Sequence, residues 1–136
     1  MIKEIVKDQF FLSIKSVPAT LEDAYIIADL LDTLTFHRER CVGIAANMLG
    51  YLKTMMVVND NGQYIILINP VILKAEGMYK TKEGCLSHIG EKEVTRYQKI
   101  KVEYLDEKFK KKIKTYAGYT AEIIQHELDH FEGKLI

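Results

Sequence analysis

The feature that most constrains this chain is a pair of histidines near its C-terminal end, His126 and His130. Four residues span about one turn of an α-helix, so the two imidazoles would lie on one face, with Glu127 beside it. Two neutral imidazoles can bind a divalent metal ion, and a neighbouring carboxylate can take a proton from water bound to that ion. The pattern therefore predicts a helix that carries a metal site. The alternative is a solvent-facing helix on which two histidines occur by chance.

A catalytic site of this kind usually takes three protein ligands and leaves one position open. After His130 only Glu132 could bind a metal, and it lies about 200° around the helix, so the third ligand should come from upstream. The candidates are Cys41, Cys85, His37, His88 or a carboxylate. Cys85 is favoured, because polar residues and glycines flank it and a thiolate binds a divalent metal well. We expect Cys41 to be a buried thiol and His37 a solvated surface residue, and a buried, inert Cys85 is the alternative.

Composition limits the class of protein. The 136 residues suit one domain, with 48% hydrophobic and 28% charged residues. Nineteen basic residues balance 19 acidic ones, so no overall field favours DNA or an anionic membrane. The charged first ten residues are not a signal peptide, and no apolar run approaches the ~20 residues of a membrane span. These features favour a cytoplasmic enzyme of bacterial type.

The first half of the chain predicts one amphipathic helix. Residues 1–17 read as an irregular lead-in, and Thr20 with Asp23 fits a capping box. The helix of about four turns would bury a stripe of apolar residues at spacings of three and four: Leu21, Ala24, Tyr25, Ala28, Leu31 and Leu34, widened by Ile27 and Leu30. Residues 41–50 are rich in small residues and lack a period. They suit the close approach of another backbone, such as a peptide, or equally a tight core turn.

Two β-rich runs, 53–59 and 63–69, flank Asn61-Gly62, and this spacing predicts a hairpin. Asn69-Pro70 is expected to end the second strand, because proline cannot donate to the ladder. Residues 71–74 could form a third short strand.

The alternating pattern over 100–104 predicts a half-buried strand, and 108–114, with five lysines, its exposed return strand. A ribosome-facing patch is a less favoured alternative for these lysines than a solvated face. The final helix is expected over about 120–132, with Gly133 as its C-terminal stop.

Together the motifs resemble those of the peptide deformylase family. That family has three blocks in fixed order: Gly-x-Gly-x-Ala-Ala-x-Gln, Glu-Gly-Cys-Leu-Ser and Gln-His-Glu-x-Asp-His. This chain has CVGIAANM over 41–48, EGCLS over 83–87 and QHELDH over 125–130, and the tail 131–135 is also similar. The resemblance covers nearly the whole chain, and its second and third blocks are complete.

The resemblance implies an α+β fold, with antiparallel β-sheets wrapped around a central C-terminal helix that carries the HExxH motif, plus the N-terminal amphipathic helix. It implies that Cys85, His126 and His130 bind one divalent metal, with Fe(II) as the natural ion and Zn(II), Ni(II) or Co(II) as alternatives. Glu127 would be the general base, and the Leu86 main-chain N–H would stabilise the developing oxyanion.

The reaction implied is removal of the formyl group from the N-terminal methionine of newly made polypeptides, a step that takes place near the ribosome. The family pattern suggests an ion pair between Glu83 and Arg96 that holds the Cys85 loop. The substrate-binding residues implied are Gly43, Ile44, Met48 and Gly84, the first two through main-chain groups.

The first block departs from the family pattern at two positions, Cys41 and Met48. Met48 stands in place of the glutamine whose amide polarises the formyl oxygen, and a thioether has no N–H to donate. Cys41 replaces the first glycine, and Asn47 could supply an amide only if the loop shifted by one residue. His88-Ile89 also stands where the family often has a Val-Pro or Ile-Pro step.

These departures leave two alternatives open. One is a divergent deformylase that is slow or acts on another N-acyl peptide, because losing one oxyanion donor typically costs a hundred- to a thousand-fold in rate. The other is a non-catalytic peptide- or ribosome-binding module that keeps the metal for stability. The intact Glu127 weighs against the second alternative, since a purely structural metal site does not need that carboxylate.

Overall fold

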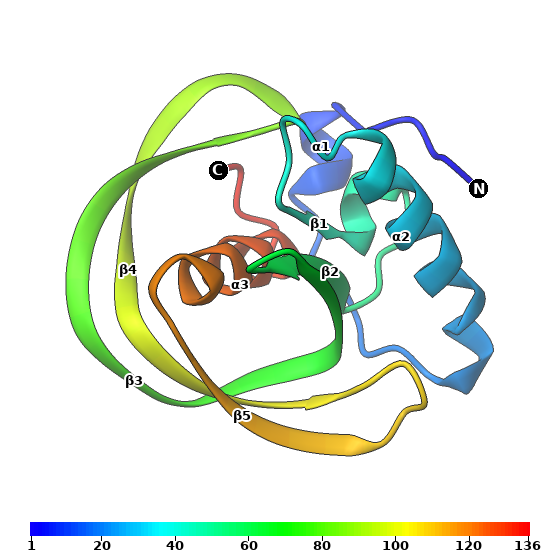
Figure 1. The fold of residues 1–136 in the computed structure, drawn as a ribbon. Coiled ribbons are helices and arrows are strands. Elements are labelled where there is room, and N and C mark those ends of the chain that lie inside the picture. Colours follow the sequence, from blue (N-terminus) through cyan, green and yellow to red (C-terminus); the bar gives the residue numbers. More distant parts are fainter.

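The computed structural model describes residues 1–136, apart from the side chain of His88. Figure 1 shows the elements in chain order. They are α1 (Gln9–Leu12), a 3-10 turn η1 (Leu21–Asp23), α2 (Tyr25–Phe36), β1 (Gly43–Ala45), a 3-10 turn η2 (Ala46–Leu49), β2 (Met55–Asp60), β3 (Gln63–Cys85), β4 (His88–Leu105), β5 (Lys111–Ala117) and α3 (Gly118–Phe131).

The described strands form one antiparallel sheet in the order β1-β2-β3-β4-β5. The sheet curves around α3, while α1 and α2 lie outside β1 and β2 (Figure 1). The fold is therefore α+β, with an antiparallel sheet and a C-terminal helix. The resemblance implied more than one sheet, whereas the described strands form one continuous sheet, because β3 and β4 are long enough to bend around the helix.

The turn between β2 and β3 forms as predicted. Asp60 pairs with Gln63, and the two residues between them have positive φ angles, 52° at Asn61 and 95° at Gly62. Two consecutive positive φ angles match the right-handed twist of the flanking strands, and asparagine and glycine adopt them most readily.

The expected end of the second strand at Asn69-Pro70 is wrong. β3 runs on to Cys85, and the expected short strand 71–74 is part of it. The pairing with β4 shifts register between Ile68 and Val71, so Pro70 lies in a bulge where the ladder needs no N–H donor. Asn69 has a φ of 51°, and its amide bonds both main-chain groups of Ala19.

The helix after Thr20 begins with the turn η1, where the Asp23 carboxylate accepts from the Thr20 main-chain N–H at 2.9 Å. The buried stripe differs from the expected one: it consists of Ile26, Leu30, Thr33 and Leu34. Leu21 and Tyr25 are 71% and 60% exposed. Because several positions of this helix are apolar, spacing alone could not tell which side faces the sheet.

Helix α3 is the central element of the core. Ala121, Ile124 and Phe131 are buried on it, and Gln125 fastens it to β4. The Gln125 amide accepts from the Tyr97 N–H at 2.8 Å and donates to the Tyr97 carbonyl at 2.9 Å, as a neighbouring strand would. The predicted stop at Gly133 is confirmed by its φ of 79° and its N–H bond to the His130 carbonyl.

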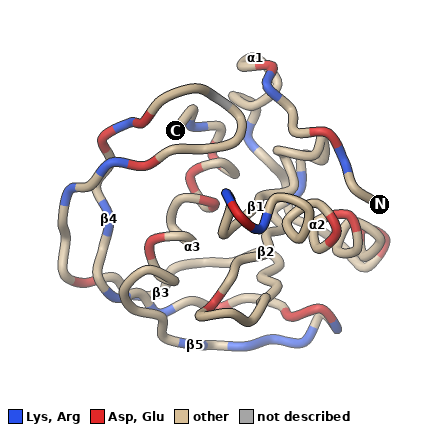
Figure 2. Tube along the Cα trace, turned by 45° about the horizontal axis from the view of Figure 1, so that its top comes forward, with Lys and Arg blue, Asp and Glu red and all other residues tan. Residues whose placement is uncertain are grey.

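The lysine run lies on β5 and the turn before it, as Figure 2 shows. Lys111 and Lys112 are exposed and reach Glu103 at 3.0 Å and Asp106 at 4.0 Å. Lysines on an outer strand discourage pairing with the strands of other molecules. Among the described helices, none combines the length and the apolar character that a membrane span requires.

Candidate metal centre

Three side chains from distant parts of the sequence converge beside α3. Cys85 ends β3, and His126 and His130 lie one turn apart on α3. The Cys85 Sγ lies 3.3 Å from the His130 Nε2, which lies 3.2 Å from the His126 Nε2. Within the described part of the chain, this is the group of three potential ligands whose atoms all lie within 4.8 Å of one another. Cys85 is therefore the upstream candidate that the fold brings beside the two histidines.

The spacing of these atoms fits a bound divalent cation. A tetrahedral ion with ordinary Zn–N and Zn–S bonds would separate two nitrogens by roughly 3.3 Å and a nitrogen from a sulfur by roughly 3.6 Å. Burial lowers the pKa of His126, but hydrogen bonds with Cys85 and Glu83 outweigh that effect and raise it to about 10. The surroundings thus favour positive charge at this point, and the residues present fit a metal ion.

A second layer of contacts orients the His126 ring. The His126 Nδ1 lies 2.7 Å from the Glu83 carboxylate, so the Nε2 is turned toward Cys85 and His130. Arg96 donates two hydrogen bonds to Glu83, at 2.7 and 3.0 Å, and one to Asp129 at 2.7 Å. Burial raises the pKa of Glu83, but its bonds from His126 and Arg96 outweigh this and lower it to about 2. Glu83 is therefore an anion that binds strand and helix together.

Glu127 lies beside the three ligands and is buried, with 3% of its surface exposed. Its Oε1 has no hydrogen-bond partner within the described structure, and burial raises its pKa to about 7. Its Oε2 would lie 3.0 Å from a Cβ added at Gly43, so only a glycine allows β1 to approach this carboxylate so closely. An unpartnered buried carboxyl group beside a metal site is available for proton transfer.

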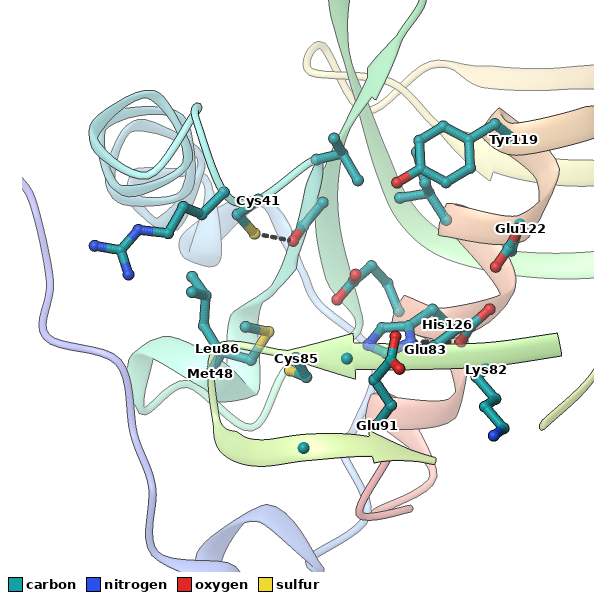
Figure 3. Close-up of a pocket in the computed structure, with 17 residues that line it drawn as sticks. Cys41, Met48, Lys82, Glu83, Cys85, Leu86, Glu91, Tyr119, Glu122 and His126 are labelled. Atoms are coloured by element: carbon teal, nitrogen blue, oxygen red, sulfur yellow. Dashed lines mark hydrogen bonds and ion pairs between the residues drawn. The ribbon is translucent and has the colours of Figure 1, made fainter. Parts of the chain in front are cut away.

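Glu83, Cys85, His126 and Glu127 line one cavity of about 560 Å³ (Figure 3). One wall is the segment before and within β1, the second is the end of β3 and the start of β4, and the floor is α3. The lining residues are Arg40, Cys41, Val42, Gly43, Met48, Lys82, Glu83, Gly84, Cys85, Leu86, Gly90, Glu91, Tyr119, Glu122, Ile123, His126 and Glu127.

The structure brings most of the predicted site residues together. Gly43, Met48, Gly84 and Leu86 all line the cavity. Ile44 differs: it is fully buried, is not among the residues found to line the cavity, and pairs with Val57 of β2. The Ile44 main-chain groups are turned toward β2, so Gly43 is the residue of β1 that can meet a peptide.

The remaining candidates from the sequence are not part of the cluster of potential metal ligands. The amide of Asn47 donates to the His130 carbonyl at 3.0 Å, so it anchors the end of α3 and does not replace the missing glutamine. Cys41 is half-buried in the cavity wall, and burial raises the pKa of its thiol to about 12. The His37 ring packs edge-on against Phe36. The side chain of His88 lies outside the described structure.

Sequence reasoning missed several lining residues and the second partner of Arg96. Asp129 lies inside the QHELDH motif, three residues after His126, and that spacing was a usable signal that it shares a helix face with the site. Glu122 and Tyr119 stand one and two turns before His126 on the same face, and both line the cavity. The cavity is also lined by Val42, Lys82 and Glu91. They reach it because β1 and the hairpin formed by the end of β3 and the start of β4, here called the β3–β4 arm, fold over α3. No local sequence pattern predicts this packing.

A largely enclosed cysteine–histidine–histidine cluster with an adjacent buried carboxyl group, open to a cavity in an α+β fold, is the arrangement of a metal-dependent hydrolase. The family model for polypeptide deformylase matches residues 2–136. A peptide deformylase of Clostridium beijerinckii is 52% identical over 136 residues, which is the full length of both chains. One of Symbiobacterium thermophilum is 44% identical over 98% of this chain and 64% of its own.

Solved structures of peptide deformylases have the same fold as this chain. A class I type b peptide deformylase from Acinetobacter baumannii with Met-Ala-Ser bound superposes with a TM-score of 0.90 at 25% identity, covering 99% of this chain and 97% of that one. A peptide deformylase from Legionella pneumophila gives 0.88 at 32% identity, covering 99% and 83%. The chain belongs to the peptide deformylase family. It is a bacterial-type hydrolase of that metal-dependent family, and the deformylase interpretation of its sequence is confirmed.

Proposed function

We propose that residues 1–136 act as a single catalytic domain that removes the formyl group from the N-terminal methionine of new polypeptides in the cytoplasm. The observation that carries the proposal is the convergence of Cys85, His126 and His130, with the buried Glu127 beside them, at a cavity that Cys85, His126 and Glu127 line. The intact Glu127 argues for catalysis and against a non-catalytic binding module.

Cys85, His126 and His130 are the residues that would hold the metal, and Glu83 would orient the His126 ring toward it. The resemblance supports Fe(II), with Zn(II), Ni(II) or Co(II) able to take its place. When bound, such a cation supplies Lewis acidity, which lowers the pKa of water toward neutrality.

The remaining steps belong to the chain. Glu127 accepts the proton of the attacking water and passes it to the amine that leaves as the formamide bond breaks. The Leu86 N–H donates to the formyl oxygen as charge develops there. Gly84 and Gly43 both line the cavity, and their main-chain groups would bind the main chain of the peptide.

The side chain of the first methionine would fill the part of the cavity between β1 and α3. Val42, Tyr119 and Ile123 line this part and supply apolar surface. The Acinetobacter relative with bound Met-Ala-Ser supports a substrate of this kind. A nascent peptide as substrate would place the enzyme near the ribosomal exit tunnel.

Met48 favours a second candidate, a deformylase with reduced activity. In the place of the family's glutamine it presents a thioether, and its sulfur is engaged by the Ala45 N–H at 3.5 Å. The cavity therefore has one oxyanion donor fewer than the family pattern provides, and the expected consequence is a lower kcat on the same substrate.

The test is release of formate from formyl-Met-Ala-Ser by protein loaded with iron without oxygen, with the metal content of the same sample measured by elemental analysis. Wild-type protein should turn over, and Glu127→Gln should lose at least a hundred-fold in kcat with its metal retained. Folded, iron-loaded wild type that releases no formate would refute the proposal. A Glu127→Gln variant as fast as wild type would refute the role of that carboxyl group.

A further inference from the structure

The strand that faces the cavity, β1, is an edge of the sheet and pairs on one side only, with β2. The Asn59 N–H donates to the Val42 carbonyl, and Gly43 stands opposite Val58. In an antiparallel pair the N–H and C=O of one residue point to the same side, and successive residues alternate. The main-chain groups of Gly43 and Ala45 therefore point away from β2, toward the open edge.

Both outward-facing residues of β1 are engaged by sulfur. The Cys41 thiol donates to the Gly43 carbonyl at 2.9 Å, drawn as a dashed line in Figure 3. The Ala45 N–H donates to the Met48 sulfur at 3.5 Å. Cys41 and Met48 are the two positions at which the first block departs from the family pattern, and each engages a main-chain group on the open edge of β1.

Of the two groups, only that of Gly43 is within reach of a substrate. Ala45 is fully buried, whereas Gly43 lines the cavity. The buried Glu127 carboxyl group, with its unpartnered Oε1, lies against Gly43 from the side of α3. A peptide nitrogen placed between Glu127 and β1 would thus find the Gly43 carbonyl as its main-chain acceptor.

We propose that Cys41 is a positioning residue that occupies the Gly43 carbonyl in the free enzyme, and that a substrate N–H must displace its thiol to pair with β1. The inference rests on the proposed function, since it concerns how a peptide enters the same cavity. Burial keeps the thiol protonated, so it is a donor at neutral pH. The substitution of a glycine by Cys41 thereby weakens peptide binding without touching the reacting bond.

The experiment compares Cys41→Ala with Cys41→Ser, two variants that differ by one oxygen atom. Binding of the product-like peptide Met-Ala-Ser to zinc-loaded protein is measured by calorimetry, and KM and kcat are measured separately with formyl-Met-Ala-Ser. Alanine frees the carbonyl and should tighten peptide binding and lower KM roughly two- to five-fold, while serine keeps a donor and should bind at least as weakly as wild type. The value of kcat should stay within two-fold in both.

Equal affinities of the alanine and serine variants would overturn the inference, because the effect would then follow side-chain size. Weaker binding by Cys41→Ala would also overturn it, since the thiol would then support the peptide site. Unfolding midpoints within about 2 °C of wild type show that both variants fold. If wild type binds Met-Ala-Ser but releases no formate, the proposed function fails. The ranking of the three peptide affinities, wild type against Cys41→Ala and Cys41→Ser, still tests the role of Cys41. Absence of Met-Ala-Ser binding in wild type and both variants overturns the inference about Cys41, whereas the proposed function stands or fails on formate release.

Discussion

At the scale of single residues, Met48 separates this chain most clearly from its family pattern. Its side chain is 1% exposed, and its sulfur accepts from the Ala45 N–H. A glutamine has a carbonyl oxygen that can accept that same bond and an amide nitrogen that can donate into the cavity. Met48 thus replaces the hydrogen-bond acceptor of a glutamine side chain, but it has no group that replaces the N–H donor.

Met48→Gln should therefore increase kcat for formyl-Met-Ala-Ser by roughly a hundred-fold, the usual value of one oxyanion donor. The measurement is formate release by iron-loaded protein. Met48→Leu is the matched control, because it has neither donor nor acceptor. It should not gain activity, and it should lose about 1–3 kcal/mol of stability by leaving the Ala45 N–H without a partner. A glutamine variant no faster than wild type would remove Met48 as the cause of low activity.

At the scale of elements, the site depends on the ion pairs that connect β3 and β4 with α3. Arg96 on β4 is 3% exposed and bonds Glu83 on β3 and Asp129 on α3. Breaking a buried ion pair is costly, because the remaining charge stays desolvated. The same arginine fixes the carboxylate that orients His126, so stability and metal affinity are coupled here.

Arg96→Met should lower the free energy of unfolding by roughly 3–5 kcal/mol and weaken zinc binding about 10- to 100-fold. Urea unfolding and metal competition would measure the two effects. Lys99→Met is the control on the same strand, since Lys99 reaches Glu76 only at 3.8 Å on the exposed surface and should cost less than about 1 kcal/mol. Equal losses from both variants would contradict the role given to Arg96.

At the scale of the whole molecule, the candidate metal ligands come from segments 45 residues apart in the chain. Cys85 ends the long arm, and His130 lies near the end of α3, their side chains 3.3 Å apart. A metal that binds the folded state stabilises it in proportion to the logarithm of its concentration. Metal binding should therefore stabilise the whole fold as well as supply chemistry.

Zinc at a hundred times its Kd should raise the unfolding temperature by roughly 10 °C over chelator-treated protein, which corresponds to about 2.7 kcal/mol. Differential scanning calorimetry would show the shift. Cys85→Ser should abolish most of it, whereas His37→Ala, which removes a histidine outside the site, should keep it. An identical unfolding temperature with and without zinc would count against a metal held by Cys85, His126 and His130.

Local patterns in the sequence were sufficient for the features that depend on neighbouring residues. The Asn61-Gly62 turn, the Gly133 helix stop and the helical spacing of His126 and His130 each follow from backbone preferences or a fixed period. The choice of Cys85 as third ligand also followed from chemistry, because few side chains upstream could bind a metal.

Only the tertiary structure decided which faces and edges the elements present. Tyr25 and Leu30 are both apolar, yet only Leu30 faces the core, because packing against the sheet selects one side of α2. The strand β3 passes Pro70 because the bulge needs no donor there. The sulfur contacts of Cys41 and Met48 depend on β1 being an edge strand. The sequence determined the chemical groups and their local conformation, whereas long-range packing decided their neighbours.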